Sequence, residues 1–213
     1  MKKILLSLGT GIMAVALMFG LYSTPQANGK ALVDKPAPDF TLINTDGKKV
    51  SLTDFKGKYV VLEWINYDCP FVAKHYNGGN MQALQKKYME KGCVWLAICS
   101  SAPGKQGHFS NEAIHQRMKA HNSEVSAYLH DENGEIGRLY GATNTPNMYI
   151  INPDGELEYR GAIDSIRSAN QADIAKADNY VAMALDAAMA GEEIKVNMTR
   201  AYGCDVKSLS LLS

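Results

Sequence analysis

The chain has few cysteines, and it has no excess of charge of either sign. Its 213 residues contain four cysteines, which is too few for a disulfide scaffold of this length, so the fold has to depend on a hydrophobic core. The 22 Lys and Arg residues balance 22 Asp and Glu residues. This balance argues against nucleic acid as a partner, because proteins that bind nucleic acid usually present a strongly basic surface.

Motifs for metal and phosphate binding are also missing. The five histidines of the chain lack the paired spacing of zinc ligands. They are His75, His108, His115, His121 and His130. The glycine-containing loop at residues 100–107 lacks the pattern that binds phosphate, and we expect it to border the active site. The sequence therefore predicts no metal and no cofactor.

The N-terminal segment has the three parts of a secretory signal peptide. Lys2 and Lys3 precede a mostly apolar stretch at residues 4–21, and small residues at 27 and 29 fit a cleavage site. We predict a signal peptide at residues 1–29 and a periplasmic or secreted protein. An uncleaved membrane anchor is the alternative, because the apolar stretch is almost long enough to span a bilayer.

The remaining residues, 30–213, are predicted to form one α/β domain that ends in a tail at residues 191–213. Alternating and continuous apolar stretches predict the strands, and turn residues such as Asp46-Gly47 separate them. We expect strands at 40–43, 50–52, 59–65, 94–98, 126–129, 147–151 and 157–161. We expect helices at 70–76, at 81–91 with Asn80 as its N-cap, and at 111–120, 134–140 and 172–190.

Cys69 is the most informative residue of the chain. It follows the apolar strand predicted at 59–65 and precedes Pro70, a residue that favours the first position of a helix. We expect its sulfur to face the free backbone N–H groups of that helix, which stabilise a thiolate. A helix terminus alone supplies about 0.3–1 kcal/mol, so Lys74 and His75 are candidates for additional stabilisation. The alternative is an inert buried cysteine.

The order of these elements resembles the thioredoxin fold, a central mixed sheet flanked by helices, here with an N-terminal β-hairpin and a C-terminal helix and tail. The residues 37–42, 46–48 and 55–58 resemble the redoxin branch, which includes the alkyl hydroperoxide reductase and thiol-specific antioxidant family. The residues 68–76 and 202–207 resemble exported peroxiredoxin-like proteins of that branch. The resemblance covers about residues 34–207.

This resemblance implies roles for several residues. Pro146 aligns with the cis-proline of thioredoxins, and together with Thr145, Asp68 and Pro70 it would position the substrate. Glu63, six residues before Cys69, aligns with a buried acid that relays protons; an ion pair or a strand-edge carboxylate is the alternative interpretation. Val72 stands where a thioredoxin has its second cysteine, and Asn66 and Leu62 stand where a peroxiredoxin has Thr or Ser and Pro.

A second cysteine is needed to release a product bound to Cys69. We prefer Cys204, because it lies on the tail, where a chain end can reach the site. An exposed free thiol or a static disulfide is the alternative role for Cys204. Cys99 is the second choice, since it ends a strand next to the one that leads to Cys69, and Cys93 is expected to be structural.

The sequence thus predicts an exported thiol-dependent oxidoreductase, in which Cys69 attacks a peroxide or a disulfide and Cys204 resolves the product. Its partners would be a peroxide or disulfide substrate and a thiol reductant, either a protein or a small thiol. A homodimer is left open. The rival hypothesis is a non-catalytic module of the same fold that carries copper or binds a partner protein.

Overall fold

The computed structural model describes residues 30–208 of the chain. The signal peptide predicted at residues 1–29 therefore lies outside the described residues. Within residues 30–208, no helix is long and apolar enough to cross a membrane.

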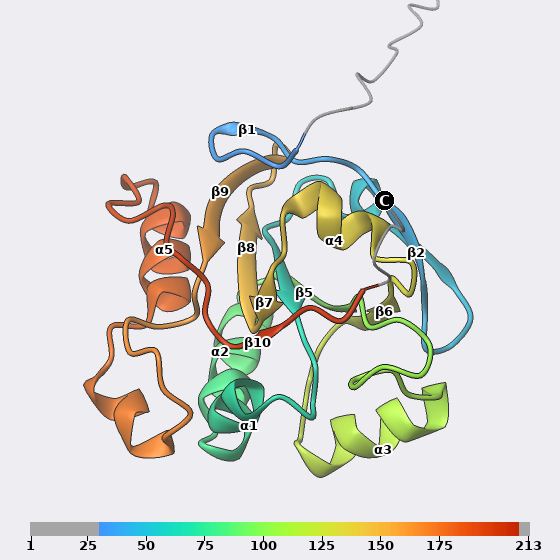
Figure 1. Ribbon diagram of the computed structural model, residues 1–213. Coiled ribbons are helices and arrows are strands. Elements are labelled where there is room, and N and C mark those ends of the chain that lie inside the picture. The colour runs from blue at the N-terminus through green and yellow to red at the C-terminus, as the bar shows by residue number, and fades with distance from the viewer. Residues whose placement is uncertain (1–29, 209–213) are drawn as a thin grey trace, which may run out of the picture.

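In this part of the chain, eight strands form one mixed sheet in the order β1-β9-β8-β4-β5-β6-β2-β3. The central strands β4, β5 and β6 are parallel, and β8 pairs antiparallel with β4 (Figure 1). The strands are β1 (Lys35–Pro36), β2 (Thr41–Asn44), β3 (Lys49–Ser51), β4 (Val60–Trp64), β5 (Val94–Cys99), β6 (Ala127–His130), β8 (Asn147–Ile151) and β9 (Glu156–Gly161). A separate two-stranded pair consists of β7 (Asn144–Thr145) and β10 (Cys204–Asp205).

The sheet has a packed layer on each face. The side chains of β4 point alternately into one layer and the other. Val61 and Glu63 point to one face, and Val60, Leu62 and Trp64 point to the other. All five residues of β4 are buried, which confirms the strand predicted to be covered on both sides.

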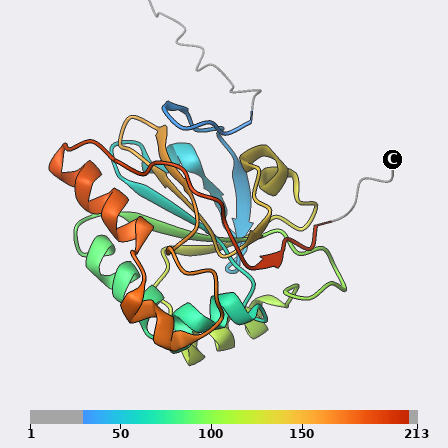
Figure 2. The same ribbon diagram turned by 60° about the vertical axis from the view of Figure 1, so that its left-hand side comes forward.

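Helices cover the face with Val61 and Glu63, as the two views show (Figures 1 and 2). They are α1 (Pro70–Asn77), α2 (Asn80–Met89), α3 (Asn111–Ala120) and α5 (Tyr180–Ala190). The other face packs against α4 (Glu135–Tyr140), the short 3-10 helix η1 (Leu52–Phe55) and the N-terminal segment. The predicted thioredoxin-like architecture is therefore confirmed.

Two local predictions are wrong. Asn80 does not cap α2, because Gly79 takes the N-cap position in a left-handed conformation, and the Asn80 side chain bonds to His75 and Asn179 instead. The long helix predicted at 172–190 is two elements, the 3-10 helix η2 (Gln171–Lys176) and α5. Ala177 is extended, and the Asn179 side chain caps α5 by accepting a bond from the Ala182 N–H at 3.0 Å.

The described part of the C-terminal tail, residues 191–208, is held by backbone hydrogen bonds. Thr199 N–H donates to the Arg160 carbonyl of β9, Val206 N–H donates to Thr143, and Ala102 N–H donates to Lys207. The sequence suggested a chain end that swings toward the site. The structure instead shows a tail that already runs beside it, because two strand edges were available for pairing (Figure 2).

Replacing Asn179 by alanine should lower the free energy of unfolding by about 1 kcal/mol, because the N-cap bond of α5 is lost. Urea denaturation of the purified protein measures the change. Asn179→Asp is the control, since a carboxylate also caps a helix, and it should retain most of the stability. Equal losses in the two variants would show that the cap is not responsible.

Candidate active site around Cys69

Cys69 is the N-cap residue of α1, and Pro70 occupies the first helical position as predicted. The cysteine is fully buried. Its sulfur does not face the helix as expected: among the described residues no N–H of the first turn bonds to it. The Cys69 thiol instead donates to the carbonyl oxygen of Thr145 at 3.1 Å. The sulfur is thus directed at β7 because that strand offers an acceptor.

Thr145 and Pro146 form the segment that faces Cys69, and the peptide bond between them is cis. Thr145 is buried, and its backbone pairs antiparallel with Cys204 while Asn144 pairs with Asp205. The Asn144 side chain adds a bond to the Gly203 carbonyl at 3.0 Å. The same short strand therefore contacts Cys69 and holds the segment that contains Cys204.

Cys204 lies opposite Thr145, the residue whose carbonyl accepts the Cys69 thiol. Burial raises the pKa of the Cys204 thiol to about 12, and the neighbouring Cys69 contributes to this rise. Cys204 therefore stays protonated at neutral pH in the reduced protein. Since only a thiolate is a good nucleophile, Cys204 is a poor candidate for the first attack.

Neither of the two nearby basic residues adds positive charge at the Cys69 sulfur. Lys74 is buried and directs its ammonium to Asp164 at 2.8 Å and to the Ile166 carbonyl at 3.1 Å. Burial lowers the pKa of His75 to about 4, so its ring is neutral at pH 7. The expectation that these side chains would stabilise a thiolate by direct contact is therefore not met by the described residues.

Glu63 is fully buried behind the site on β4, and no ion pair involves it among the described residues. Its carboxyl accepts bonds from the Tyr76 hydroxyl at 3.1 Å and from the Trp95 indole N–H at 2.8 Å. Burial raises the pKa of Glu63 to about 7, although these bonds oppose the rise. A carboxyl with this pKa exchanges its proton near neutral pH, which suits a proton-transfer group.

The loop after β5 borders the site, as the sequence indicated. The Gln106 side chain donates to the Asp68 carbonyl at 3.3 Å, and the Asn66 amide donates to the Gln106 carbonyl at 3.5 Å. Asp68 is exposed, and its carboxylate lies 3.7 Å from Arg117. Asp68 and Pro70 thus lie on either side of Cys69, one at the surface and one in the first turn of α1.

The other two cysteines have different surroundings. Cys99 ends β5 beside the Cys69 strand as predicted, but its thiol donates to the Gly107 carbonyl at 3.4 Å. Burial raises the pKa of Cys93 to about 11, so this thiol is protonated and unreactive at neutral pH. The geometry therefore favours Cys204 over Cys99 as the partner of Cys69.

Two residues next to the site were missed by the sequence reasoning. Asp164 pairs with Lys74, and Tyr202 hydrogen-bonds to both of them. Tyr202 does precede Gly203-Cys204 in the tail motif, which is the one hint in the sequence. Nothing local distinguishes Asp164 from the other acids of the loops.

The cysteine at the start of α1, the facing cis-proline segment and the thioredoxin-like sheet define a thioredoxin-fold oxidoreductase. A family model described as the AhpC/TSA family matches residues 33–160. The chain belongs to the AhpC/TSA family, which confirms the resemblance to the redoxin branch.

Similar proteins agree with this class. The thiol-disulfide oxidoreductase ResA of Bacillus cereus is 29% identical over 156 residues, which is 73% of this chain and 83% of the relative. ResA of Oceanobacillus iheyensis is 31% identical over 153 residues, which is 69% of this chain and 74% of the relative. A solved structure described as an uncharacterized conserved protein from Geobacillus kaustophilus is 28% identical, with a TM-score of 0.72 over 85% of this chain and 94% of that one.

Glu63 should make the stability of the fold depend on pH. Its pKa is about 7 in the folded chain against a reference value of 4.5. The folded state therefore binds the Glu63 proton more tightly than the unfolded state does. The stabilisation that this proton contributes is full below pH 4.5 and is lost as the pH rises to about 7. The shift corresponds to about 3 kcal/mol.

Urea denaturation from pH 4 to 8 tests this prediction. Relative to the wild type, Glu63→Gln should gain about 3 kcal/mol in free energy of unfolding across that range, because its amide does not ionise. Glu90→Gln, a change at an exposed acid, is the control and should leave the pH profile unchanged. Parallel profiles for wild type and Glu63→Gln would contradict the raised pKa.

Proposed function

We propose that this chain is an exported thiol-disulfide oxidoreductase in which Cys69 is the nucleophile and Cys204 the resolving thiol. The observation that supports the proposal most is the pairing of β7 with β10, in which Cys204 lies opposite Thr145, the residue whose carbonyl accepts the Cys69 thiol. The names of the ResA relatives agree with this activity. The N-terminal sequence, with its basic start and apolar stretch, supports export to the periplasm or beyond.

The reaction would proceed in two exchanges. The Cys69 thiolate attacks one sulfur of a substrate disulfide, and the other substrate sulfur leaves as a thiolate. Cys204 then attacks the Cys69 sulfur and releases the second substrate thiol. Two electrons pass from the protein dithiol to the substrate, and a thiol reductant restores the protein.

The surroundings of Cys204 suit the second exchange. In the reduced protein burial, and to a smaller extent the neighbouring Cys69 thiol, keep the pKa of Cys204 high. Once the Cys69 sulfur is bound in a mixed disulfide, it bears neither a charge nor a proton, and this contribution disappears. Cys204 therefore ionises more readily at the step that requires its thiolate.

Disulfide exchange fits the geometry better than peroxide reduction. The Cys69 sulfur faces the backbone of Thr145, and this backbone pairs with an extended strand that contains a cysteine. A strand is the form in which a protein would present its own sulfur to the site. Thr145, Pro146, Pro70 and Asp68 would position such a substrate, and Glu63 would assist proton transfer behind the site.

Replacing either thiol should stop turnover at a different stage. We expect Cys69→Ser to abolish disulfide reduction, and Cys204→Ser to stop at a mixed disulfide on Cys69, because no resolving thiol remains. Peptide mapping without reductant, after one equivalent of glutathione disulfide, measures both species. Wild type should yield a Cys69–Cys204 crosslink.

Cys93→Ser is the matched control, since Cys93 is buried away from the pair, and it should behave as wild type. Full turnover in Cys69→Ser would contradict the proposal. A crosslink that forms faster with hydrogen peroxide than with the disulfide would indicate a peroxidase. Stoichiometric Cu(I) binding that depends on Cys69, without turnover, would favour a carrier.

A further inference from the structure

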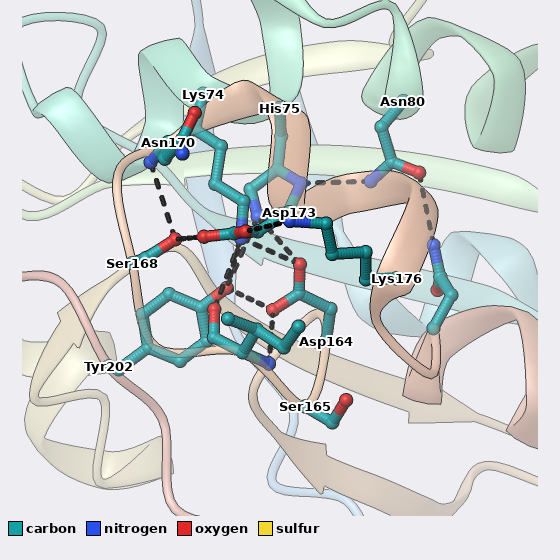
Figure 3. A network of polar contacts seen from close by, with 12 residues as sticks. Lys74, His75, Asn80, Asp164, Ser165, Ser168, Asn170, Asp173, Lys176 and Tyr202 are labelled. Atoms are coloured by element: carbon teal, nitrogen blue, oxygen red, sulfur yellow. Dashed lines mark hydrogen bonds and ion pairs between the residues drawn. The ribbon is translucent and has the colours of Figure 1, made fainter.

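A buried polar cluster joins Lys74, Asp164 and Tyr202 (Figure 3). The Lys74 ammonium is 2.8 Å from the Asp164 carboxylate, and the two side chains are 0% and 3% exposed. The Tyr202 hydroxyl donates to the other Asp164 oxygen and lies 3.3 Å from the Lys74 nitrogen. Three distant segments therefore meet here: α1, the loop after β9 and the C-terminal tail.

A buried ion pair of this kind does not by itself make a protein more stable. Removing two charges from water costs about as much free energy as their attraction and the further hydrogen bonds recover. Apolar residues of similar size would stabilise the same contact. The Lys74–Asp164 pair, however, binds a phenol hydroxyl at a fixed position, which an apolar pocket cannot do.

Among the described residues of the tail, Tyr202 alone enters this cluster, and it is two positions before Cys204. The Tyr202 ring is 3% exposed, and it packs edge to face against Phe71 at 5.8 Å between ring centroids. Phe71 and Lys74 belong to α1, the helix that begins at Cys69. The tail is thus fixed to the same helix that fixes the nucleophile.

Gly203, between Tyr202 and Cys204, allows the tail to approach β7 closely. Its φ is +127°, and a Cβ atom at this position would overlap the Thr145 carbonyl oxygen. That oxygen is the acceptor of the Cys69 thiol. Three consecutive residues of the tail therefore have three different parts: Tyr202 is bound by the ion pair, Gly203 approaches Thr145 and Cys204 supplies the thiol.

We infer that Tyr202 is a positioning residue, which holds the Cys204 thiol against Cys69 by binding the Lys74–Asp164 pair through its hydroxyl. The inference rests on the proposed function, because it concerns the resolving step. Anchoring the tail raises the effective concentration of Cys204 at the Cys69 sulfur. Without the anchor, the tail around Cys204 would be held by β10 and by the bonds of Gly203 with Asn144 and of Val206 with Thr143.

The equilibrium between the protein dithiol and glutathione disulfide measures this effective concentration. The protein loses two electrons and two protons and forms the Cys69–Cys204 bond, and one glutathione disulfide becomes two glutathione molecules. A weaker anchor makes the intramolecular bond less favourable. The mixed disulfide of Cys69 with glutathione then accumulates.

The test uses the mature protein in glutathione buffers of defined ratio, with the species quantified by mass spectrometry. Tyr202→Ala should lower the equilibrium constant on the order of tenfold or more, because both ring and hydroxyl are lost. Tyr202→Phe retains the ring and should lower it about threefold. Tyr88→Phe is the matched control, since it removes another buried phenol bond, from Tyr88 to the Ala182 carbonyl at 3.0 Å, and it should not change the constant.

The outcomes distinguish failure of the Tyr202 positioning role from failure of the proposed function. Equal constants in wild type and both Tyr202 variants would overturn the positioning role and leave the proposed function intact. An equal decrease in Tyr88→Phe and Tyr202→Phe would also overturn it, because the effect would then be general destabilisation. If wild type forms no Cys69–Cys204 bond, both hypotheses fail. Should Tyr202→Ala not fold, the phenylalanine variant decides.

Discussion

The antiparallel pairing of β7 with β10 is the contact on which the site depends. β7 presents a carbonyl to the Cys69 thiol, and the backbone of the same residue, Thr145, pairs with Cys204. Strand pairing fixes register by backbone hydrogen bonds, so Cys204 lies opposite the residue whose carbonyl accepts the Cys69 thiol. The rest of the fold places this edge: β8 continues from Pro146 into the centre of the sheet, next to β4.

Each buried ionisable group near the site is either paired with an opposite charge or kept neutral. Lys74 faces Asp164, and His75 is neutral because burial lowers its pKa to about 4. Glu63 has only neutral donors, and its raised pKa of about 7 keeps it partly protonated at neutral pH. This division follows from the cost of burying an unpaired charge, which a protein avoids by pairing the charge or by neutralising it. The site thus combines two thiols with one titrating acid and one fixed ion pair.

The tail is therefore part of the domain and not an appendage to it. It pairs with β9 through Thr199, anchors Tyr202 against α1 and only then reaches the site. The AhpC/TSA family model ends at residue 160, so the second cysteine and its anchor both lie beyond the matched region. Val72 stands where a thioredoxin pair would have its second cysteine, so in the proposed function the resolving thiol, Cys204, comes from the tail.

The sequence alone determined the features that depend on local patterns. The apolar stretch of β4, Pro70 at the first position of α1 and the position of Cys69 between them follow from residue spacing, and so does the thioredoxin-like order of elements. Only the tertiary structure decided that the Cys69 sulfur faces Thr145, that Lys74 faces Asp164 and that Tyr202 anchors the tail. These contacts join residues that are 76, 90 and 128 positions apart. No local pattern encodes them, because they arise when separate strand edges and helix faces compete for the same partners.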